Sequence, residues 1–237
     1  MRVQIERRSL QIDDPWVDAV DVAVHRPTRP AGAAVLLTHG AGTDLDAPWL
    51  AALADSIAAE GRLVVRVNQP WKQSGRAAPP PVHRAVPGFV EVAAAVRRTF
   101  GPRRRWVVGG HSNGGRIASH AVAEGLVRTA GLLLLGYPLC APRHPDDPRV
   151  GHWPSIAVPM LVLQGTHDPF GGADAVARHA DLPRAPVTLH TVTGADHGFA
   201  VPRTRSPDGV RREGATVCGG LGSAVSGWLA TAVDASS

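Results

Sequence analysis

The stretch Gly110-His111-Ser112-Asn113-Gly114 decides the fold prediction for this chain. An apolar run, residues 106–108, precedes it, and a helix-like segment, residues 116–127, follows it. This order predicts a strand, a sharp turn and a helix, with Ser112 at the apex of the turn. Glycine is expected on both sides of the serine, because strand and helix approach each other too closely there for a β-carbon. We therefore predict that the Ser112 hydroxyl stands clear of the sheet edge as a nucleophile.

An acid and a histidine follow downstream, each just after a predicted strand. The apolar run 160–163 leads to Asp168, and the alternating run 187–192 leads to His197. In parallel α/β sheets the carboxyl ends of the strands lie at one edge, so these side chains are expected to meet Ser112. We predict that His197 acts first as a base and then as an acid, while Asp168 holds its tautomer and stabilises its charged form.

Other residues compete for these roles. Asp168 lies in Asp-Pro-Phe-Gly-Gly, which also favours a turn, but capping and catalysis are compatible. Asp196 is the rival acid, yet as the immediate neighbour of His197 it cannot easily reach back to the ring. His111 is the rival base, but a residue beside the nucleophile in such a turn is expected to point away from it.

A glycine-rich turn, His39-Gly40-Ala41-Gly42, follows a predicted buried strand over residues 33–38. Such a turn supplies one backbone N–H to the oxyanion of acyl transfer, and the residue after the nucleophile supplies the other. The amides of Ala41 and Asn113 are the predicted donors. The alternative for the turn is an ordinary strand-to-helix connection.

These motifs, in this order, resemble the α/β-hydrolase superfamily, broadly its dienelactone-hydrolase and small-esterase branch. A closer resemblance is to the α/β-hydrolase-like domain of the KANL/Tex group. The residues that carry the resemblance span positions 37 to 197: Leu37-Thr38-His39-Gly40-Ala41-Gly42, Gly110-His111-Ser112-Asn113-Gly114-Gly115-Arg116, Gly136-Tyr137-Pro138-Leu139, Gln164-Gly165-Thr166-His167-Asp168-Pro169-Phe170-Gly171 and Asp196-His197.

The resemblance implies an α/β-hydrolase fold in which Ser112, Asp168 and His197 match the triad of the family. Asn113 departs from the pattern, since methionine is expected after the nucleophile, but only its backbone amide is needed. Dienelactone hydrolases themselves use cysteine, so the serine here argues against that particular reaction.

The whole chain reads as one α/β domain, residues 1–237, with a mostly parallel sheet of about eight strands flanked by helices and no large cap domain. The predicted strands lie at residues 3–6, 19–25, 33–38, 63–68, 106–109, 131–135, 160–163 and 187–192. The predicted helices lie at residues 48–60, 86–100, 115–127 and 173–180, with a final helix over 216–232.

Two segments are candidates for the substrate pocket. Trp71, Lys72 and Arg76 follow the fourth strand and, with His39 and Gly40, are the candidate substrate-binding residues. The two cations would suit an acidic substrate, and the alternative is a proline-stiffened surface connection. Arg116 lies on the same helix face as Ser112, where helix burial or a salt bridge is the common fate of an arginine.

The second segment runs over residues 140–159 and contains five prolines. About twenty residues broken by prolines are too few for the helical lid that many α/β-hydrolases carry. We therefore expect an open site that suits small, soluble or polymer-end substrates better than long-chain lipids.

Composition excludes several other classes. The chain has 237 residues, 44% hydrophobic content and a net charge of +5, with Lys72 as its sole lysine. The densest basic run, residues 103–105, reads as a solvated patch rather than a nucleic-acid surface, because only 5% of the residues are aromatic. No secretory signal, membrane span or disulfide framework is indicated, so a cytoplasmic protein, monomeric or homodimeric, is expected.

No motif for a metal, a dinucleotide or a nucleotide phosphate is present, so no cofactor and no metal are expected. The sequence predicts a cofactor-independent serine hydrolase that cleaves an ester or related acyl bond of a small molecule. The alternative is a binding or interaction module with a vestigial site, since a fold alone does not guarantee activity. Peptide cleavage or acyl transfer by the same residues also stays open.

Overall fold

Eight strands form one sheet in the computed structural model, which describes residues 2–235. The strand order across the sheet is β1-β2-β4-β3-β5-β6-β7-β8. The strands β1 and β2 pair antiparallel to each other, β2 pairs antiparallel to β4, and all remaining pairs are parallel. The strands are β1 (Val3–Gln11), β2 (Ala19–Pro27), β3 (Ala34–Thr38), β4 (Val64–Val67), β5 (Trp106–His111), β6 (Gly131–Leu135), β7 (Met160–Gly165) and β8 (Val187–Val192).

The predicted mostly parallel sheet of about eight strands is therefore confirmed. The central strands β3, β5, β6 and β7 are buried along their whole length, because helices cover both faces of the sheet. This is why they read as unbroken apolar runs. The edge strands β1 and β8 are partly exposed.

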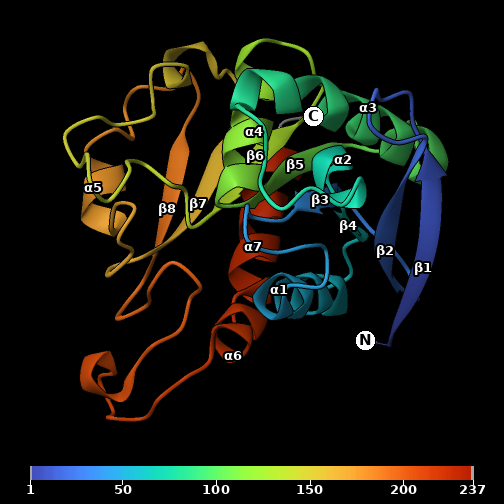
Figure 1. Ribbon diagram of the computed structural model, residues 1–237. Helices are drawn as coiled ribbons and strands as arrows, with labels where there is room; N and C mark the ends of the chain where they lie inside the picture. Colours follow the sequence, from blue (N-terminus) through green and yellow to red (C-terminus); the bar gives the residue numbers. More distant parts are fainter. Residues whose placement is uncertain (1, 236–237) are drawn as a thin grey trace.

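Helices cover the two faces as separate layers (Figure 1). On one face lie α1 (Pro48–Ala59), α6 (Gly214–Gly219), α7 (Gly222–Trp228) and the π-helical turn η3 (Leu229–Asp234). On the other lie α3 (Val82–Phe100) and α4 (Asn113–Ala123). The remaining helical segments are short: α2 (Pro70–Gln73), α5 (Ala173–Ala177) and the single turns η1 (Trp153–Ser155) and η2 (Arg203–Arg205).

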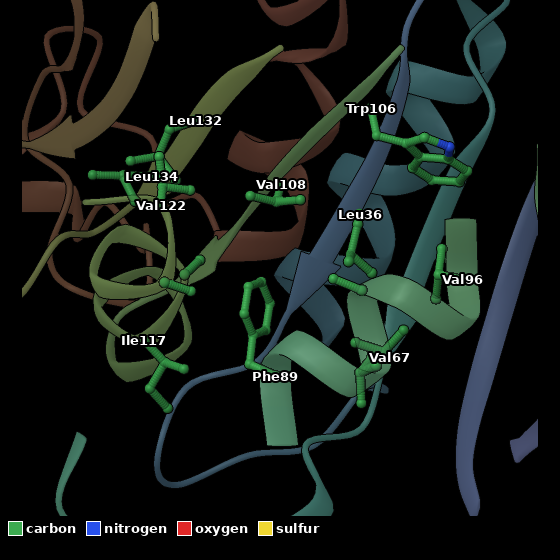
Figure 2. Close-up of a cluster of buried hydrophobic side chains, with 14 of the residues drawn as sticks. Leu36, Val67, Phe89, Val96, Trp106, Val108, Ile117, Val122, Leu132 and Leu134 are labelled. Carbon is green, nitrogen blue, oxygen red and sulfur yellow. The ribbon is translucent and has the colours of Figure 1, made fainter. Parts of the chain in front are cut away.

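The core on the α3 and α4 face is shown in Figure 2. Leu36, Val108 and Leu134 project from neighbouring strands and belong to the same buried cluster as Phe89 of α3 and Ile117 of α4. A second buried cluster occupies the opposite face of the sheet, beneath α1 and α7. These two layers fix the strand ends, and hence the loops that carry the candidate site.

Two helix predictions need correction. The final helix predicted over residues 216–232 is split, because the N–H groups of Gly220 and Leu221 bond three residues back and close α6. The helix predicted from residue 86 begins at Val82, and Pro87 lies inside it. Proline at that position removes its own N–H bond and crowds the carbonyl of residue 83, yet the helix continues to Phe100.

The segment between β6 and β7 contains only the single turn η1, and the described residues include no cap domain. Trp153 of this turn is fully buried beneath the segment. Within residues 2–235, no helix combines the length and the apolar character needed to cross a membrane.

Candidate active site

Ser112 lies between β5 and α4 in a strained backbone conformation, with φ 51° and ψ −120°. A positive φ is uncommon for a residue other than glycine and is often found at functional sites. A β-carbon at Gly110 would overlap the carbonyl oxygen of Thr38, and one at Gly114 would overlap that of His39. The backbone of β3 and of the turn after it therefore excludes a side chain at these two positions, whereas the predicted close approach of β5 to α4 falls on Gly115, where a β-carbon would lie 2.6 Å from the carbonyl oxygen of Gly110.

The structure brings together the three residues that the sequence placed on separate strand exits. His197 Nε2 lies 2.8 Å from Ser112 Oγ, and His197 Nδ1 lies 2.8 Å from Asp168 Oδ2. An ionised Asp168 only accepts, so Nδ1–H donates to it and Nε2 is left to accept the serine proton. This continuous chain of hydrogen bonds can draw a proton from Ser112 and hold it on the imidazole.

Asp168 is held from both sides in the interior. Its carboxylate is fully buried. Gln164 Nε2 donates to Oδ2 at 3.0 Å, and the Phe170 amide donates to Oδ1 at 2.8 Å. The carboxylate therefore caps its own turn while it orients His197. Sequence analysis missed the role of Gln164, although a polar residue at the end of a buried strand is a usable signal.

The rival acid forms a different set of bonds. Asp196 Oδ1 accepts from the amides of Gly198 and Ala200, at 2.9 and 3.0 Å. It closes the turn that carries His197. Phe199 in this turn is fully buried at φ 63°, which is a genuine outlier for an aromatic residue.

His111 contacts the backbone and the ring of His197. Its Nε2 lies 2.9 Å from the carbonyl oxygen of His197, and the two ring centroids are 4.9 Å apart. Burial, reinforced by the neighbouring His197, lowers the pKa of His111 to about 4. The ring is therefore neutral, and Nε2–H donates to the carbonyl. It has no hydrogen bond to Ser112, so the rival base acts instead as a support for the His197 loop.

His39 fixes the glycine-rich turn after β3. Its Nδ1–H donates to the carbonyl of Gly40 at 2.8 Å, and its Nε2 accepts from the amide of Gln69 at 3.1 Å. Burial lowers its pKa to about 4, which keeps the ring neutral. A side chain at Gly40 would stand 3.4 Å from the β-carbon of Ser112. The turn therefore lies directly against the serine.

The amides of Ala41 and Asn113 are available as donors. Ala41 belongs to the turn just described, and Asn113 is the first residue of α4, where N–H groups have no partner within the helix. No acceptor within residues 2–235 takes a hydrogen bond from either amide. Both residues are partly exposed. Two free donors thus lie beside Ser112, as an oxyanion site requires.

The other candidate substrate residues have different surroundings. Trp71 is only 1% exposed and donates its indole N–H to Gln69 Oε1, so it supports the loop rather than facing solvent. Arg76 is exposed, with its guanidinium 5.0 Å from the ring centre of Trp16. Lys72 is partly buried and close enough to His39 to oppose its protonation. His39 itself is buried, whereas Lys72 is partly exposed.

A hollow of about 410 Å³ adjoins His197. The start of α1 forms one side with Pro48 and Trp49, and residues 213–215 form another. Trp49 also contacts the edge of the His111 ring, with centroids 5.5 Å apart. The hollow is open to solvent.

The neutral states of His39 and His111 make stability depend on pH. Unfolding raises each pKa from about 4 to 6.5, so the unfolded chain binds more protons between these values. The contribution of each neutral ring to the free energy of unfolding should be fully present above pH 6.5. It should fall by about 3 kcal/mol for each ring as the pH drops towards 4. Urea unfolding at several pH values between 4 and 6.5 measures how steeply the free energy of unfolding changes with pH.

The controls use a matched substitution. His39→Gln and His111→Gln should each flatten the slope, whereas His83→Gln, at an exposed position on α3, should leave it as in the unmodified protein. A slope that is the same in all three variants would contradict the assignment.

Residues 31–217 match the family described as Alpha/beta hydrolase domain, and the chain belongs to this family. Its fold is similar to that of dienelactone hydrolase from Anabaena variabilis ATCC 29413, with a TM-score of 0.70, 14% identity and coverage of 98% of this chain and 100% of that chain. The fold is also similar to that of XC6422 from Xanthomonas campestris, an α/β serine hydrolase without a lid, with a TM-score of 0.66, 22% identity and coverage of 94% of this chain and 95% of that chain. For TT1662 from Thermus thermophilus the TM-score is 0.62 and the identity 25%, with coverage of 97% of this chain and 99% of that chain.

The predicted membership of the α/β-hydrolase superfamily is thereby confirmed, and hydrolase chemistry is the activity class it supports. A specific closeness to the KANL/Tex group stays a prediction.

Proposed function

We propose that the protein is a cofactor-independent serine hydrolase that cleaves a carboxylic ester or a related acyl bond. The observation that carries the proposal is the unbroken chain from Ser112 Oγ through His197 to Asp168, with both contacts at 2.8 Å. In this series of hydrogen bonds Ser112 is the nucleophile, His197 carries the proton and Asp168 is the orienting carboxylate.

In the proposed mechanism, Ser112 Oγ attacks the substrate carbonyl carbon while its proton passes to His197 Nε2. The carbonyl π electrons move to oxygen, and the amides of Ala41 and Asn113 stabilise that oxyanion. When the tetrahedral species collapses, the bond to the leaving group breaks and His197 protonates the departing oxygen. An acyl-serine and a free alcohol result.

Deacylation repeats these steps with water as the nucleophile. His197 takes a proton from water, the hydroxide adds to the acyl carbon, and the proton returns to Ser112 Oγ as the carboxylic acid leaves. Asp168 stays ionised and stabilises the imidazolium in both halves. The hollow beside His197 is where the leaving alcohol departs and water enters, because both exchange a proton with Nε2.

Reaction with a fluorophosphonate probe tests the proposal. We expect one covalent adduct per chain by intact-mass spectrometry, mapped to Ser112, because only a serine activated by a base displaces the fluoride. The adduct should be lost in Ser112→Ala and His197→Ala. Absence of an adduct on the folded protein would overturn the proposal and favour a hydrolase-shaped binding module.

A further inference from the structure

Two arginines lie outside the hydrogen-bonded chain, and one of them, Arg116, is one helical turn beyond Ser112. Arg116 is on α4, and its backbone N–H donates to the Ser112 carbonyl at 3.0 Å. Arg149 belongs to the segment between β6 and β7 and is close enough to Arg116 to lower its pKa, after the larger effect of burial. A guanidinium stays charged in proteins. The pair therefore concentrates positive charge near the nucleophile.

No carboxylate of the described chain neutralises this pair. Neither Arg116 nor Arg149 forms a salt bridge within residues 2–235, and the buried Nε of Arg116 has no hydrogen-bond partner there. Glu124 lies 3.8 Å from His120, but it is eight residues from Arg116, about 12 Å along the helix. A cation that is partly buried without a partner is unfavourable unless an anion binds it.

The neighbouring groups add no negative charge. His120 follows Arg116 by one turn of α4, and its ring stacks on His152 at 3.8 Å. Burial, and to a lesser extent the charge of Arg116, lowers the pKa of both histidines, which favours their neutral forms. His152 Nε2 lies 2.8 Å from Ser119 Oγ, which donates to the Arg116 carbonyl. Apart from Glu124, which lies 3.8 Å from His120, the cluster has no carboxylate in the described residues to pair with the guanidinium groups.

The Arg149 segment is tied to the site. Tyr137 Oη donates to the Arg149 carbonyl at 2.6 Å, and the Tyr137 amide donates to Gln164 Oε1 at 2.8 Å. Gln164 in turn holds Asp168. A chain of three hydrogen bonds, through Tyr137 and Gln164, therefore links the backbone of Arg149 to the Asp168 carboxylate.

We infer that the acyl part of the substrate carries a carboxylate, which Arg116 and Arg149 bind while Ser112 attacks the carbonyl. This inference rests on the proposed function. The leaving group departs towards His197, so the acyl chain is assigned to the opposite side of Ser112, towards α4. Four residues of α-helix rise about 6 Å, which fits a carboxylate about two to four carbon atoms from the scissile carbonyl.

This assignment revises the expectation for the cations of the chain. From the sequence, Lys72 and Arg76 were expected to contact an acidic substrate, and Arg116 was expected to be buried or to form a salt bridge. Arg76 contacts Trp16, whereas Arg116 is partly buried without a salt bridge in the described residues. The same substrate chemistry is thus better matched by Arg116 and Arg149.

Two esters with the same leaving group test the inference, with acid release followed by titration at constant pH: methyl butyrate and methyl hydrogen succinate. We expect kcat/KM for the succinate ester to exceed that for butyrate by about tenfold or more, since hydrogen bonds between charged groups are the stronger ones. Arg116→Met and Arg149→Met should each lower this ratio by about tenfold, chiefly through KM. Arg116→Lys should keep part of the ratio.

Arg97→Met on α3 is the matched control, because its guanidinium bonds to the Arg128 carbonyl and not to this cluster. It should keep the ratio of the unmodified protein. Circular dichroism and thermal unfolding check each variant, and if Arg116→Met fails to fold, Arg149→Met and competitive inhibition by free succinate against butyrate provide the same comparison.

Equal kcat/KM for the two esters, with the fluorophosphonate adduct still on Ser112, would overturn this inference and leave the proposed function intact. A succinate preference that survives both methionine variants would also overturn it. No turnover and no adduct would overturn the proposed function and this inference together.

Discussion

Replacing Ser112 with alanine should lower kcat for an activated ester by about 10³- to 10⁶-fold, in line with other serine triads. The substitution removes the only oxygen that His197 Nε2 contacts in the hydrogen-bonded chain, so no acyl-enzyme forms. The measurement is steady-state release of para-nitrophenolate by purified protein, with thermal unfolding to show that the fold is retained.

Ser226→Ala on α7 is the matched control, because it deletes a buried hydroxyl that has no hydrogen-bond partner in the described residues. Its kcat should stay within about twofold of the unmodified value, as expected for a change away from the site. If Ser112→Ala kept most of the activity, another residue would have to be the nucleophile.

Replacing Asp168 with asparagine should lower kcat by about 10⁴-fold, the magnitude known for this substitution in a serine protease triad. An asparagine amide can donate to His197 Nδ1, which moves the ring proton to Nε2. The nitrogen facing Ser112 would then be a donor and could no longer accept the serine proton. The pH dependence of kcat measured beside that of the unmodified protein reports the loss of the base.

The control for this change is Asp196→Asn. Asparagine keeps an oxygen that can accept from the Gly198 and Ala200 amides, so the turn should survive with an effect below about tenfold. Equal losses in the two variants would mean that Asp168 acts through the turn and not as the orienting carboxylate.

The arrangement of Ser112, Asp168 and His197 was predictable because each follows a strand whose pattern is unambiguous. Strands β5 and β7 are buried on both faces, and β8 alternates, so their ends are marked in the sequence. Parallel pairing then places the three strand exits at one edge. No long-range contact had to be guessed, since chain order and strand direction were sufficient.

The lining of the site was less predictable, because it depends on how loops fold over the strand ends. Trp71 and His39 looked available to a substrate, yet each is buried against the other, with ring centroids 5.6 Å apart. The supporting role of His111 depends on its contact with the His197 carbonyl, 86 residues away in the chain. Sequence spacing does not encode such a contact.

The unpaired state of Arg116 was equally hidden. A helix period places it on the Ser112 side of α4, but whether a carboxylate from another segment meets it depends on the path of the proline-rich segment after β6. That path includes Arg149, which lowers the pKa of Arg116 after the larger effect of burial, and no salt bridge to Arg116 forms within residues 2–235.

The crowding of backbone around Gly110 and Gly114 limits how this enzyme can diversify. Any side chain there collides with the carbonyl oxygens of Thr38 or His39, so the serine turn admits almost no variation. New substrate preferences must arise from the surrounding loops and the start of α1, where Arg149 and Trp49 respectively are partly exposed. Mutant libraries aimed at altered selectivity should therefore leave the turn untouched and randomise those loops.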